Sequence, residues 1–302
     1  MTQIGFVGVG LMGLPLAARL ASRGHAVKAF DVLKERMDAA RGSGAGAAAS
    51  PADAARGAEV VLLCLPTIDA VEQAAFGAHG VASAVKPPQL VVDLSTVSVA
   101  KGKEFAARLK RETGCGWIDA PMSGGPPAAA AGTLTVMAGG EDADVARIKP
   151  LMAELAARFT HMGPPGSGLV AKMINQLIVG CNFAVTAEAL VMAEAAGIDA
   201  ARLPECLAGG YADSKLFQAF YPRMQKRDYA PQGYVRQMLK DLEMVDGFAG
   251  ALHAPAPMMA QALSLYRLLF HLGHGELDTA AIFKLYERQA PGGSRSGSTV
   301  ST

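Results

Sequence analysis

A group of polar side chains interrupts an otherwise apolar stretch in the second half of the chain. Spacings of three and four residues place Lys172, Asn175 and Gln176 on one face of an α-helix. A lysine there suits the interconversion of a hydroxyl and a carbonyl group, because an ammonium can protonate a developing alkoxide. Burial lowers the pKa of a lysine, so that the amine can also take a proton. We therefore predict that Lys172 transfers a proton; the alternative is the solvated stripe of a surface helix.

A second segment with chemical potential is the run DAPMSGG at residues 119–125. Consecutive small residues with free backbone N–H groups can form a nest for an anion such as a carboxylate. Gly124 and Gly125 contribute such N–H groups, and Ser123 adds a hydroxyl donor. A tight turn between two domains is the alternative interpretation. We predict that this segment holds a carboxylate of a small molecule.

A glycine-rich loop follows the first apolar run of the chain. It consists of Gly8, Val9, Gly10, Leu11, Met12 and Gly13. The first glycine permits a tight turn, the second lets the backbone approach a pyrophosphate, and the third lets a helix pack closely on a strand. The pattern alone is weak, but a strand before it and a helix after it support it. The loop predicts a dinucleotide site, and the alternative is a glycine-rich turn of another α/β domain.

An acidic residue completes this pattern. Asp31 ends the second predicted strand, 18 positions after Gly13. A carboxylate there accepts hydrogen bonds from a ribose 2′-hydroxyl and repels a 2′-phosphate. Val32 and Leu33 provide no positive charge for that phosphate, although Lys34 is close. We therefore expect NAD as the cofactor, with NADP less favoured.

The elements that must position these residues fall into two regions. The first half alternates β-branched runs with helical patterns, which is typical of a mostly parallel sheet covered by helices. The predicted strands are residues 4–7, 26–30, 59–65, 90–94, 116–119 and 134–138. Ligands of such sheets bind beyond the carboxyl ends of the strands. Leu65, Pro66 and Thr96 follow two strands and should flank the cofactor, although Ser and Thr in such loops are also ordinary helix caps.

The second half changes to a helical pattern after the run GPPGSG at residues 163–168. Residues 169–196 predict one long helix, and shorter helices are predicted further on. These shorter segments are residues 201–207, 214–224, 235–249, 257–270 and 279–289. We predict an α/β Rossmann-type N-terminal domain (1–163) joined by the long helix to an all-α C-terminal domain (164–290). The polar tail, 291–302, is expected to be disordered.

The composition excludes several classes of protein. The 302 residues have a net charge of +1, with 51% hydrophobic and 18% charged residues, which is typical of a soluble globular protein. No long basic run is present, so we expect neither a nucleic-acid nor a membrane partner. The four scattered cysteines form no CxxC pair, which indicates a reducing, cytoplasmic compartment. The chain starts directly with a strand-like segment, and we expect no signal peptide.

Two further features invite interpretations that we reject. The apolar run 173–187 is 15 residues long, shorter than the roughly 20 residues that a membrane span requires. It also contains three amide side chains, so we predict a buried helix. His271 and His274 could suggest a metal pair, but no third ligand stands at a suitable spacing. We therefore expect no metal site.

Four motifs in this order give the chain a resemblance to a known family. Residues 8–13, 119–125, 168–176 and 240–242 resemble the corresponding segments of the β-hydroxyacid dehydrogenases, and the likeness covers about the first 290 residues. The resemblance implies an NAD(P)-dependent oxidoreductase that interconverts a small 3-hydroxy acid and its 3-oxo acid, as a homodimer or homotetramer. It implies the following site residues: Lys172 for catalysis; Ser123, Gly124, Gly125, Asn175 and Gln176 for the substrate; and Leu65, Pro66, Thr96 and Lys240 for the cofactor.

The substrate within this family is less well defined by the sequence. The pair Asn175–Gln176 resembles the pattern of the 2-hydroxy-3-oxopropionate (tartronate semialdehyde) reductases, which is our expectation, with 3-hydroxyisobutyrate dehydrogenase as the alternative. Pro126 and Pro127 fit neither group. A non-catalytic dinucleotide-binding module should lack Lys172, as imine reductases usually do. A reductase of phosphorylated sugar acids should carry basic residues within 119–132, and none is there.

Overall fold

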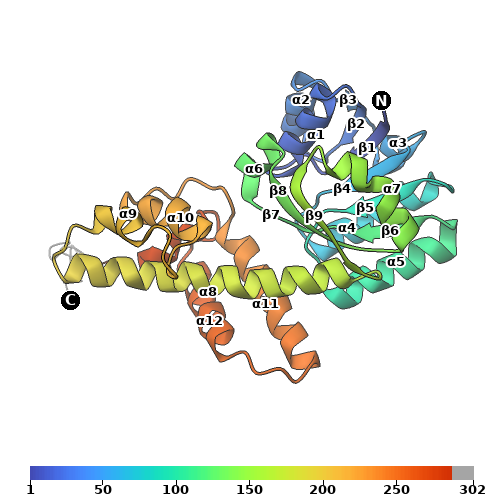
Figure 1. The fold of residues 1–302 in the computed structure, drawn as a ribbon. Helices are drawn as coiled ribbons and strands as arrows, with labels where there is room; N and C mark the ends of the chain where they lie inside the picture. Colours follow the sequence, from blue (N-terminus) through green and yellow to red (C-terminus); the bar gives the residue numbers. More distant parts are fainter. Residues whose placement is uncertain (288–302) are drawn as a thin grey trace, which may run out of the picture.

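The computed structural model describes residues 1–287 of the chain. The predicted disordered tail, 291–302, and the end of the last predicted helical segment lie outside these residues. Two lobes are visible in Figure 1, with a sheet and its helices around the N-terminus and a purely helical lobe beyond. The long helix α8 joins them. The fold class expected from the sequence, an α/β Rossmann-type domain followed by an all-α domain, is confirmed.

The N-terminal lobe is built on one sheet of nine strands in the order β3-β2-β1-β4-β5-β6-β8-β7, with β9 paired to β8. The strands are β1 (Gln3–Val7), β2 (Ala26–Phe30), β3 (Gly46–Ala47), β4 (Val60–Leu63), β5 (Leu90–Asp93), β6 (Gly116–Asp119), β7 (Met122–Ser123), β8 (Leu134–Gly139) and β9 (Ala156–Gly163). The central strands are buried along their length, as expected for strands covered on both faces. The strand order reverses between β1 and β4, which opens a crevice at their carboxyl ends.

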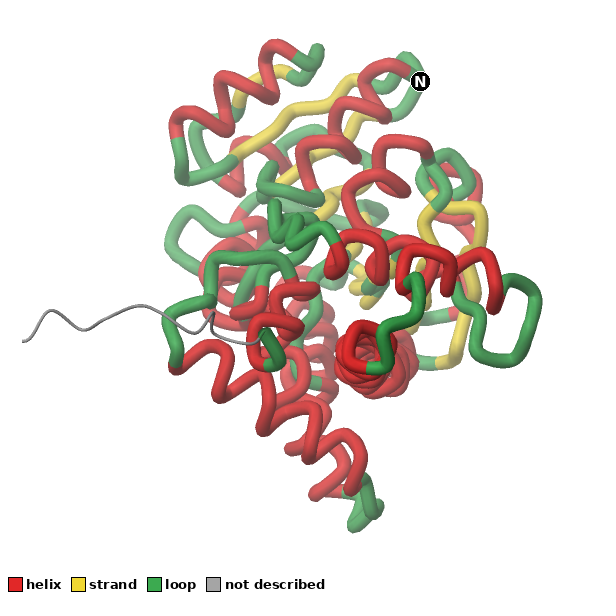
Figure 2. Tube along the Cα trace, turned by 90° about the vertical axis from the view of Figure 1, so that its left-hand side faces the viewer, coloured by secondary structure: helices red, strands yellow, loops and turns green. Residues whose placement is uncertain are grey.

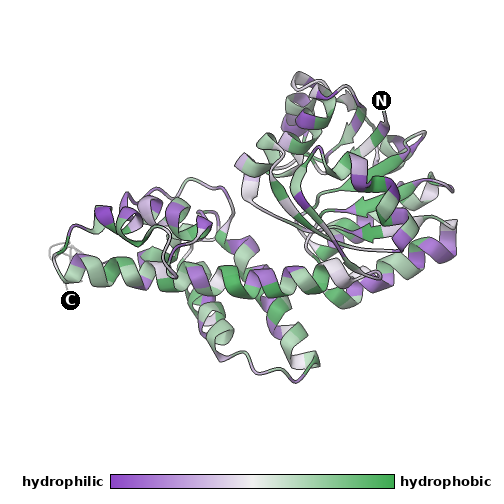
Figure 3. Ribbon diagram, in the orientation of Figure 1, coloured by the Kyte–Doolittle hydropathy of each residue, from purple (hydrophilic) through white to green (hydrophobic). Residues whose placement is uncertain are grey.

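Helices cover both faces of this sheet. They are α1 (Gly13–Ser22), α2 (Lys34–Gly42), α3 (Pro51–Ala55), α4 (Ile68–Phe76), α5 (Val99–Thr113), α6 (Gly125–Ala131) and α7 (Asp142–Met152), with a 3-10 turn η1 (Val81–Ser83). The strands form the most hydrophobic part of the lobe in Figure 3. One core cluster lies on the α1 side of the sheet, and the other is continuous with the core of the helical lobe. The two lobes therefore share buried apolar surface.

The helical lobe is arranged around α8 (Ser167–Ala195), which has 29 residues. The other helices are α9 (Leu203–Leu207), α10 (Lys215–Gln225), α11 (Val235–Ala251) and α12 (Pro257–His271), with 3-10 segments η2 (Ala200–Arg202) and η3 (Thr279–Leu285). Helices α10, α11 and α12 all contact α8. Figure 2 shows α8 nearly end-on. The axis of this helix thus organises the lobe.

Helix α8 also meets the length and composition test for a membrane span, the one helix within residues 1–287 that does so. In its most apolar window, 44% of the residues are buried inside the protein. Its buried side packs on the neighbouring helices and on the sheet. We interpret α8 as the core helix of this lobe, in agreement with its contacts.

Some elements differ from the sequence prediction. Strand β9 was not predicted, because its sequence AARFTHMG is mostly exposed and lacks apolar alternation. It lies at the end of the sheet, where only one side needs a partner strand. Residues 279–289 were predicted to be helical, whereas Thr279–Leu285 forms a 3-10 segment. Short turns with buried side chains resemble helices in sequence pattern alone.

Candidate active site

The glycine-rich loop connects β1 to α1 so tightly that Gly8 and Gly13 have no room for a side chain. Gly8 has φ +94°, and a Cβ there would collide with the carbonyl oxygen of Cys64. A Cβ on Gly13 would collide with the carbonyl oxygen of Gly8. No side chain caps the first turn of α1, and no acidic residue lies in it. The free N–H groups of a helix N-terminus bind anions such as phosphate, so this loop fits a dinucleotide.

The carboxylate of Asp31 lies directly beside this loop. Its two oxygens accept hydrogen bonds from the backbone N–H groups of Val9 and Leu33, both at 3.0 Å. Arg36, on α2, places its Nη1 3.5 Å from Asp31 Oδ2. The sequence prediction overlooked Arg36, because it considered only the residues immediately after the strand. The first turn of α2 brings the guanidinium back over the loop, beside Gly10.

The loops that follow β4 and β5 are held together at the other side of the crevice. Leu65 donates its backbone N–H to Ser95 Oγ at 2.9 Å. Lys240 of α11 donates from Nζ to the carbonyl oxygens of Pro66 and Thr96, both at 3.0 Å. Lys240 therefore bridges the helical lobe and the loops after β4 and β5. From the sequence, only the family resemblance had singled out Lys240.

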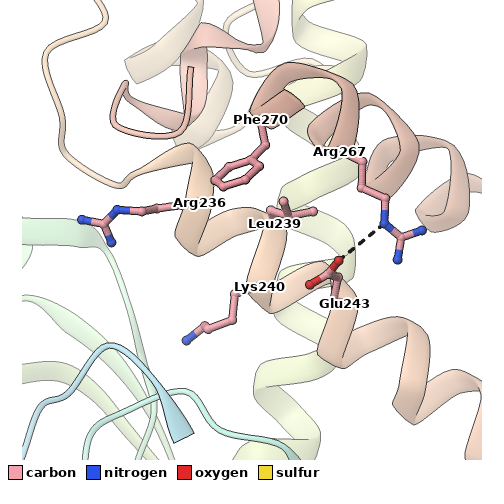
Figure 4. A pocket seen from close by; sticks show the side chains of 6 residues that line it. All are labelled: Arg236, Leu239, Lys240, Glu243, Arg267 and Phe270. Atoms are coloured by element: carbon pink, nitrogen blue, oxygen red, sulfur yellow. Dashed lines mark ion pairs between the residues drawn. The ribbon is translucent and has the colours of Figure 1, made fainter. Parts of the chain in front are cut away.

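Figure 4 shows Lys240 at the edge of an open groove of about 560 Å³ between α11 and α12. The side chain extends from α11 toward the ribbon of the N-terminal lobe. Glu243 and Arg267, further along the groove, form an ion pair at 3.5 Å. The ammonium of Lys240 is thus directed at the two loops and away from that pair.

Lys172 is buried on α8, with 6% of its surface exposed. Its Nζ donates to the carbonyl oxygen of Met122 at 2.9 Å and to Gln176 Oε1 at 3.0 Å. Burial lowers the pKa of Lys172 to about 8; the charge of Asp241 opposes this shift, and the charge of Lys240 adds to it. The amine can therefore lose and regain a proton near neutral pH.

The predicted carboxylate-binding segment continues directly from the carbonyl that holds Lys172. Ser123 ends β7, and Gly124 (φ +129°) and Gly125 (φ +70°) turn the chain into α6. Pro126 and Pro127 lie in the first turn of that helix, where proline fits because the missing N–H would be unpaired. The helix start therefore accommodates both prolines. The backbone N–H groups of Gly124 and Gly125 remain available.

Gln176, predicted from the sequence to contact the substrate, lies beside Lys172 on α8 and bonds to α11. Its side chain is buried, and its Oε1 accepts from Lys172 and from Asn175 Nδ2, the latter at 2.8 Å. Its Nε2 donates to Asp241 Oδ2 at 2.6 Å. The carboxamide is therefore engaged with protein groups, whereas Asn175 is half-buried beside it.

Comparisons with known proteins identify the family to which this fold belongs. Residues 3–163 match the family described as the NAD binding domain of 6-phosphogluconate dehydrogenase. Residues 166–286 match the NAD-binding family of NADP-dependent 3-hydroxyisobutyrate dehydrogenase. An NAD-dependent L-serine dehydrogenase of Pseudomonas aeruginosa is 35% identical over 294 residues, covering 95% of this chain and 98% of the relative. The chain belongs to the β-hydroxyacid dehydrogenase family.

Other members of the family are similarly close. A 2-hydroxy-3-oxopropionate reductase of Escherichia coli is 32% identical over 288 residues, covering 95% of this chain and 98% of the relative. The solved 3-hydroxyisobutyrate dehydrogenase of Salmonella typhimurium has a TM-score of 0.85 at 32% identity, covering 93% of this chain and 99% of that one. As a β-hydroxyacid dehydrogenase, the protein is a nicotinamide-dependent oxidoreductase acting on CH–OH groups.

Two buried carboxylates of this dehydrogenase were not singled out from the sequence. Asp119, at the end of β6, accepts hydrogen bonds from Gly166 N at 2.6 Å and Leu169 N at 2.9 Å. Asp93, at the end of β5, accepts from Ser95 N at 2.9 Å, and burial raises the pKa of Asp93 to about 7. Both end parallel strands next to the crevice, a position that could have drawn attention to them. Within residues 1–287, no group of three or more His, Cys, Asp or Glu is arranged to hold a metal.

Proposed function

We propose that this dehydrogenase uses NAD to interconvert a small 3-hydroxy acid and its 3-oxo acid, with 2-hydroxy-3-oxopropionate and glycerate as the preferred pair. The observation that carries the proposal is the buried Lys172. Its Nζ lies at hydrogen-bonding distance from Met122 of β7 and from Gln176 of α8. A buried amine with a pKa near 8 beside an anion-binding turn suits hydroxyl oxidation.

The cofactor would be held by the loop of residues 8–13, by Asp31, and by the loops after β4 and β5. The pyrophosphate fits the uncapped start of α1, and the Asp31 carboxylate fits a ribose hydroxyl. Bound there, NAD supplies a nicotinamide ring that accepts or donates a hydride. Lys240 would hold the loops that carry Leu65, Pro66 and Thr96 closed over it.

The substrate carboxylate would lie against Ser123, Gly124 and Gly125. The positive φ angles of the two glycines let their backbone N–H groups face an anion. Asn175 lies on the same face of α8 as Lys172, and its amide would contact the substrate from the helical side. The hydroxyl of a 3-hydroxy acid bound in this way would lie near Lys172 Nζ.

Proton transfer then follows from the position of Lys172. In oxidation, the neutral amine takes the hydroxyl proton while the hydride leaves the same carbon, and the C–O single bond becomes a carbonyl. In reduction, the ammonium returns a proton to the oxygen. A pKa near 8 lets one residue serve in both directions.

A substrate panel tests the proposal. Purified protein would be assayed with NAD and with NADP against glycerate, 3-hydroxyisobutyrate, L-serine and L-threonate, and for reduction of 2-hydroxy-3-oxopropionate. We expect the highest kcat/KM with NADH and 2-hydroxy-3-oxopropionate. L-Serine is the second candidate, since the Pseudomonas relative at 35% identity is an L-serine dehydrogenase. No activity with any 3-hydroxy acid would overturn the proposal.

We further propose that the protein is a cytoplasmic homodimer or homotetramer. Exposed apolar side chains follow one side of α8, namely Ile174, Ile178, Val185 and Met192. A second copy that packs along this stripe would remove it from water. Light scattering coupled to gel filtration measures the assembly, and a Val185→Glu variant should weaken it; a monomeric wild type would contradict this proposal.

A further inference from the structure

Lys172 and Asp241 lie in one buried cluster but do not contact each other. Asp241 belongs to α11 and has 8% of its surface exposed. Its charge acts on Lys172 and raises the pKa of that residue against the effect of burial. Within the described residues, the side chain that touches both is Gln176. A neutral amide therefore separates two charged groups that could otherwise pair.

The chemistry of its neighbours defines the orientation of this amide. Lys172 can donate from Nζ, and the Asp241 carboxylate can only accept. Oε1 of Gln176 must therefore face Lys172, at 3.0 Å, and Nε2 must face Asp241, at 2.6 Å. Asn175 donates a second hydrogen bond to the same Oε1 at 2.8 Å. Three hydrogen bonds thus fix the carboxamide, and its Oε1 in turn restricts the position of Lys172 Nζ.

The chain of polar contacts continues beyond Asp241. Asp241 Oδ1 lies 3.3 Å from Lys240 Nζ, and Lys240 donates to the loops after β4 and β5. Lys172 itself donates to the carbonyl of Met122 on the sheet side. The charged groups that face Lys172 are therefore Asp241 and Lys240 of α11. Asp119 of β6 lies nearby at the start of α8, where backbone N–H groups bind it.

We propose that Gln176 is a positioning residue that holds the Lys172 amine at the reacting centre and keeps the Asp241 carboxylate one side chain away from it. This inference rests on the proposed function, in which Lys172 transfers the proton. A carboxylate in direct contact with a buried lysine stabilises the ammonium and raises the lysine pKa. Gln176 provides the same anchor without a charge, and the amine stays able to accept a proton. The role is structural support for Lys172 and differs from substrate contact.

Exchanging the amide and the carboxylate tests this role. The double variant Gln176→Glu/Asp241→Asn keeps the net charge and the hydrogen-bonding pattern but moves the carboxylate next to Lys172. The ascending limb of kcat/KM for oxidation should move upward by about one to three pH units. The single variant Asp241→Asn should move the limb downward, because it removes the charge that stabilises the ammonium. Asp246→Asn, at an exposed position of the same helix, is the matched control and should leave the limb in place.

A second variant removes the hydrogen bonds that position Lys172 without changing any charge. Gln176→Leu removes all three hydrogen bonds of the carboxamide, so kcat should fall at least tenfold while the Kd for NADH changes little. Gln176→Asn, with the same group on a shorter stem, should lose activity similarly. Circular dichroism and NADH binding verify that the variants fold.

The results distinguish this inference from the proposed function. If Lys172→Ala retained activity, the proposed function itself would fail. Suppose that Lys172 proved essential, but the double variant and Asp241→Asn both showed the wild-type pH dependence of kcat/KM for oxidation. The role of Gln176 would then be overturned, while the proposed function would stand. A rise in substrate KM at unchanged kcat in Gln176→Leu would also overturn it and favour direct substrate contact.

Discussion

Asp119, at the end of β6, accepts a hydrogen bond at 2.9 Å from the backbone N–H of Leu169, in the first turn of α8. Its other oxygen accepts from Gly166 N at 2.6 Å. The first N–H groups of a helix have no partner within the helix, and here a buried carboxylate of the sheet supplies one. The helix that carries Lys172 is thereby attached to the domain that holds the cofactor loops.

Replacing Asp119 by alanine should lower the free energy of unfolding by about 1–3 kcal/mol, because two N–H groups lose their partner. Urea denaturation measures the change. Asp246→Ala is the control, since that carboxylate is exposed on α11. Equal effects of the two substitutions would show that the anchor contributes nothing special.

Lys172→Ala should lower kcat by about 10²–10⁴-fold, the usual contribution of a general acid–base group. Lys172→Arg should also fail, because a guanidinium does not deprotonate in this range. For the wild type, kcat/KM for oxidation should fall below pH 8 as the amine becomes protonated. NAD titration by fluorescence controls for folding, and turnover within a few-fold of wild type would remove Lys172 from the mechanism.

Lys172→Met should be more thermostable than the wild type at neutral pH. The lysine pKa is about 8 in the folded protein against an ordinary 10.5, so the unfolded state binds more protons between these values. The stability of the wild type therefore rises with pH across that window. The Tm advantage of the variant should shrink from pH 7.5 to 10.5 in calorimetry. A difference that does not depend on pH would show that the buried charge is not its origin.

Cofactor choice should respond to Asp31 and Arg36 in opposite directions. Asp31→Ala should weaken NAD relative to NADP, since it removes the acceptor for a ribose hydroxyl and the repulsion of a phosphate. Arg36→Ala should lower whatever NADP activity exists, because Arg36 is the cation nearest to Asp31. The ratio of kcat/KM values for the two cofactors measures both effects. A wild type with higher kcat/KM for NADP would contradict the assignment of Asp31.

Gly125→Val should impair substrate binding while cofactor binding survives. The site has room for a Cβ, but Gly125 has φ +70°, and a β-branched residue strongly disfavours that conformation. The expected result is a higher KM for the acid with an unchanged Kd for NADH. Gly13→Ala provides the opposite pattern, because its Cβ would meet the Gly8 carbonyl in the cofactor loop. Parallel loss of both affinities in Gly125→Val would indicate misfolding.

The sequence allowed prediction of those parts of the protein that depend on local pattern. The period of the strands, the loop of residues 8–13 and the long helix could be identified because each is a continuous segment. The contacts of Gln176 could not, since its partner Asp241 is 65 positions away. The roles of Arg36 and Asp119 were missed for a related reason. The contact of Arg36 with Asp31 depends on how α2 packs beside β2, and the contact of Asp119 with α8 depends on where that helix begins relative to β6. Spacing on α8 brought Gln176 and Lys172 together, but only packing against α11 determines which side the amide faces.

Asp119 attaches the N-terminal end of α8 to the sheet, so a tilt about that end would move each residue in proportion to its distance from it. A helix of its 29 residues is about 43 Å long, at a rise of about 1.5 Å per residue. Lys172 lies about 8 Å from the end fixed by Asp119, on the same scale. A tilt of about 5° would therefore move the far end by nearly 4 Å but Lys172 by less than 1 Å. A rocking of the helical lobe about this end would therefore displace its far helices much more than Lys172.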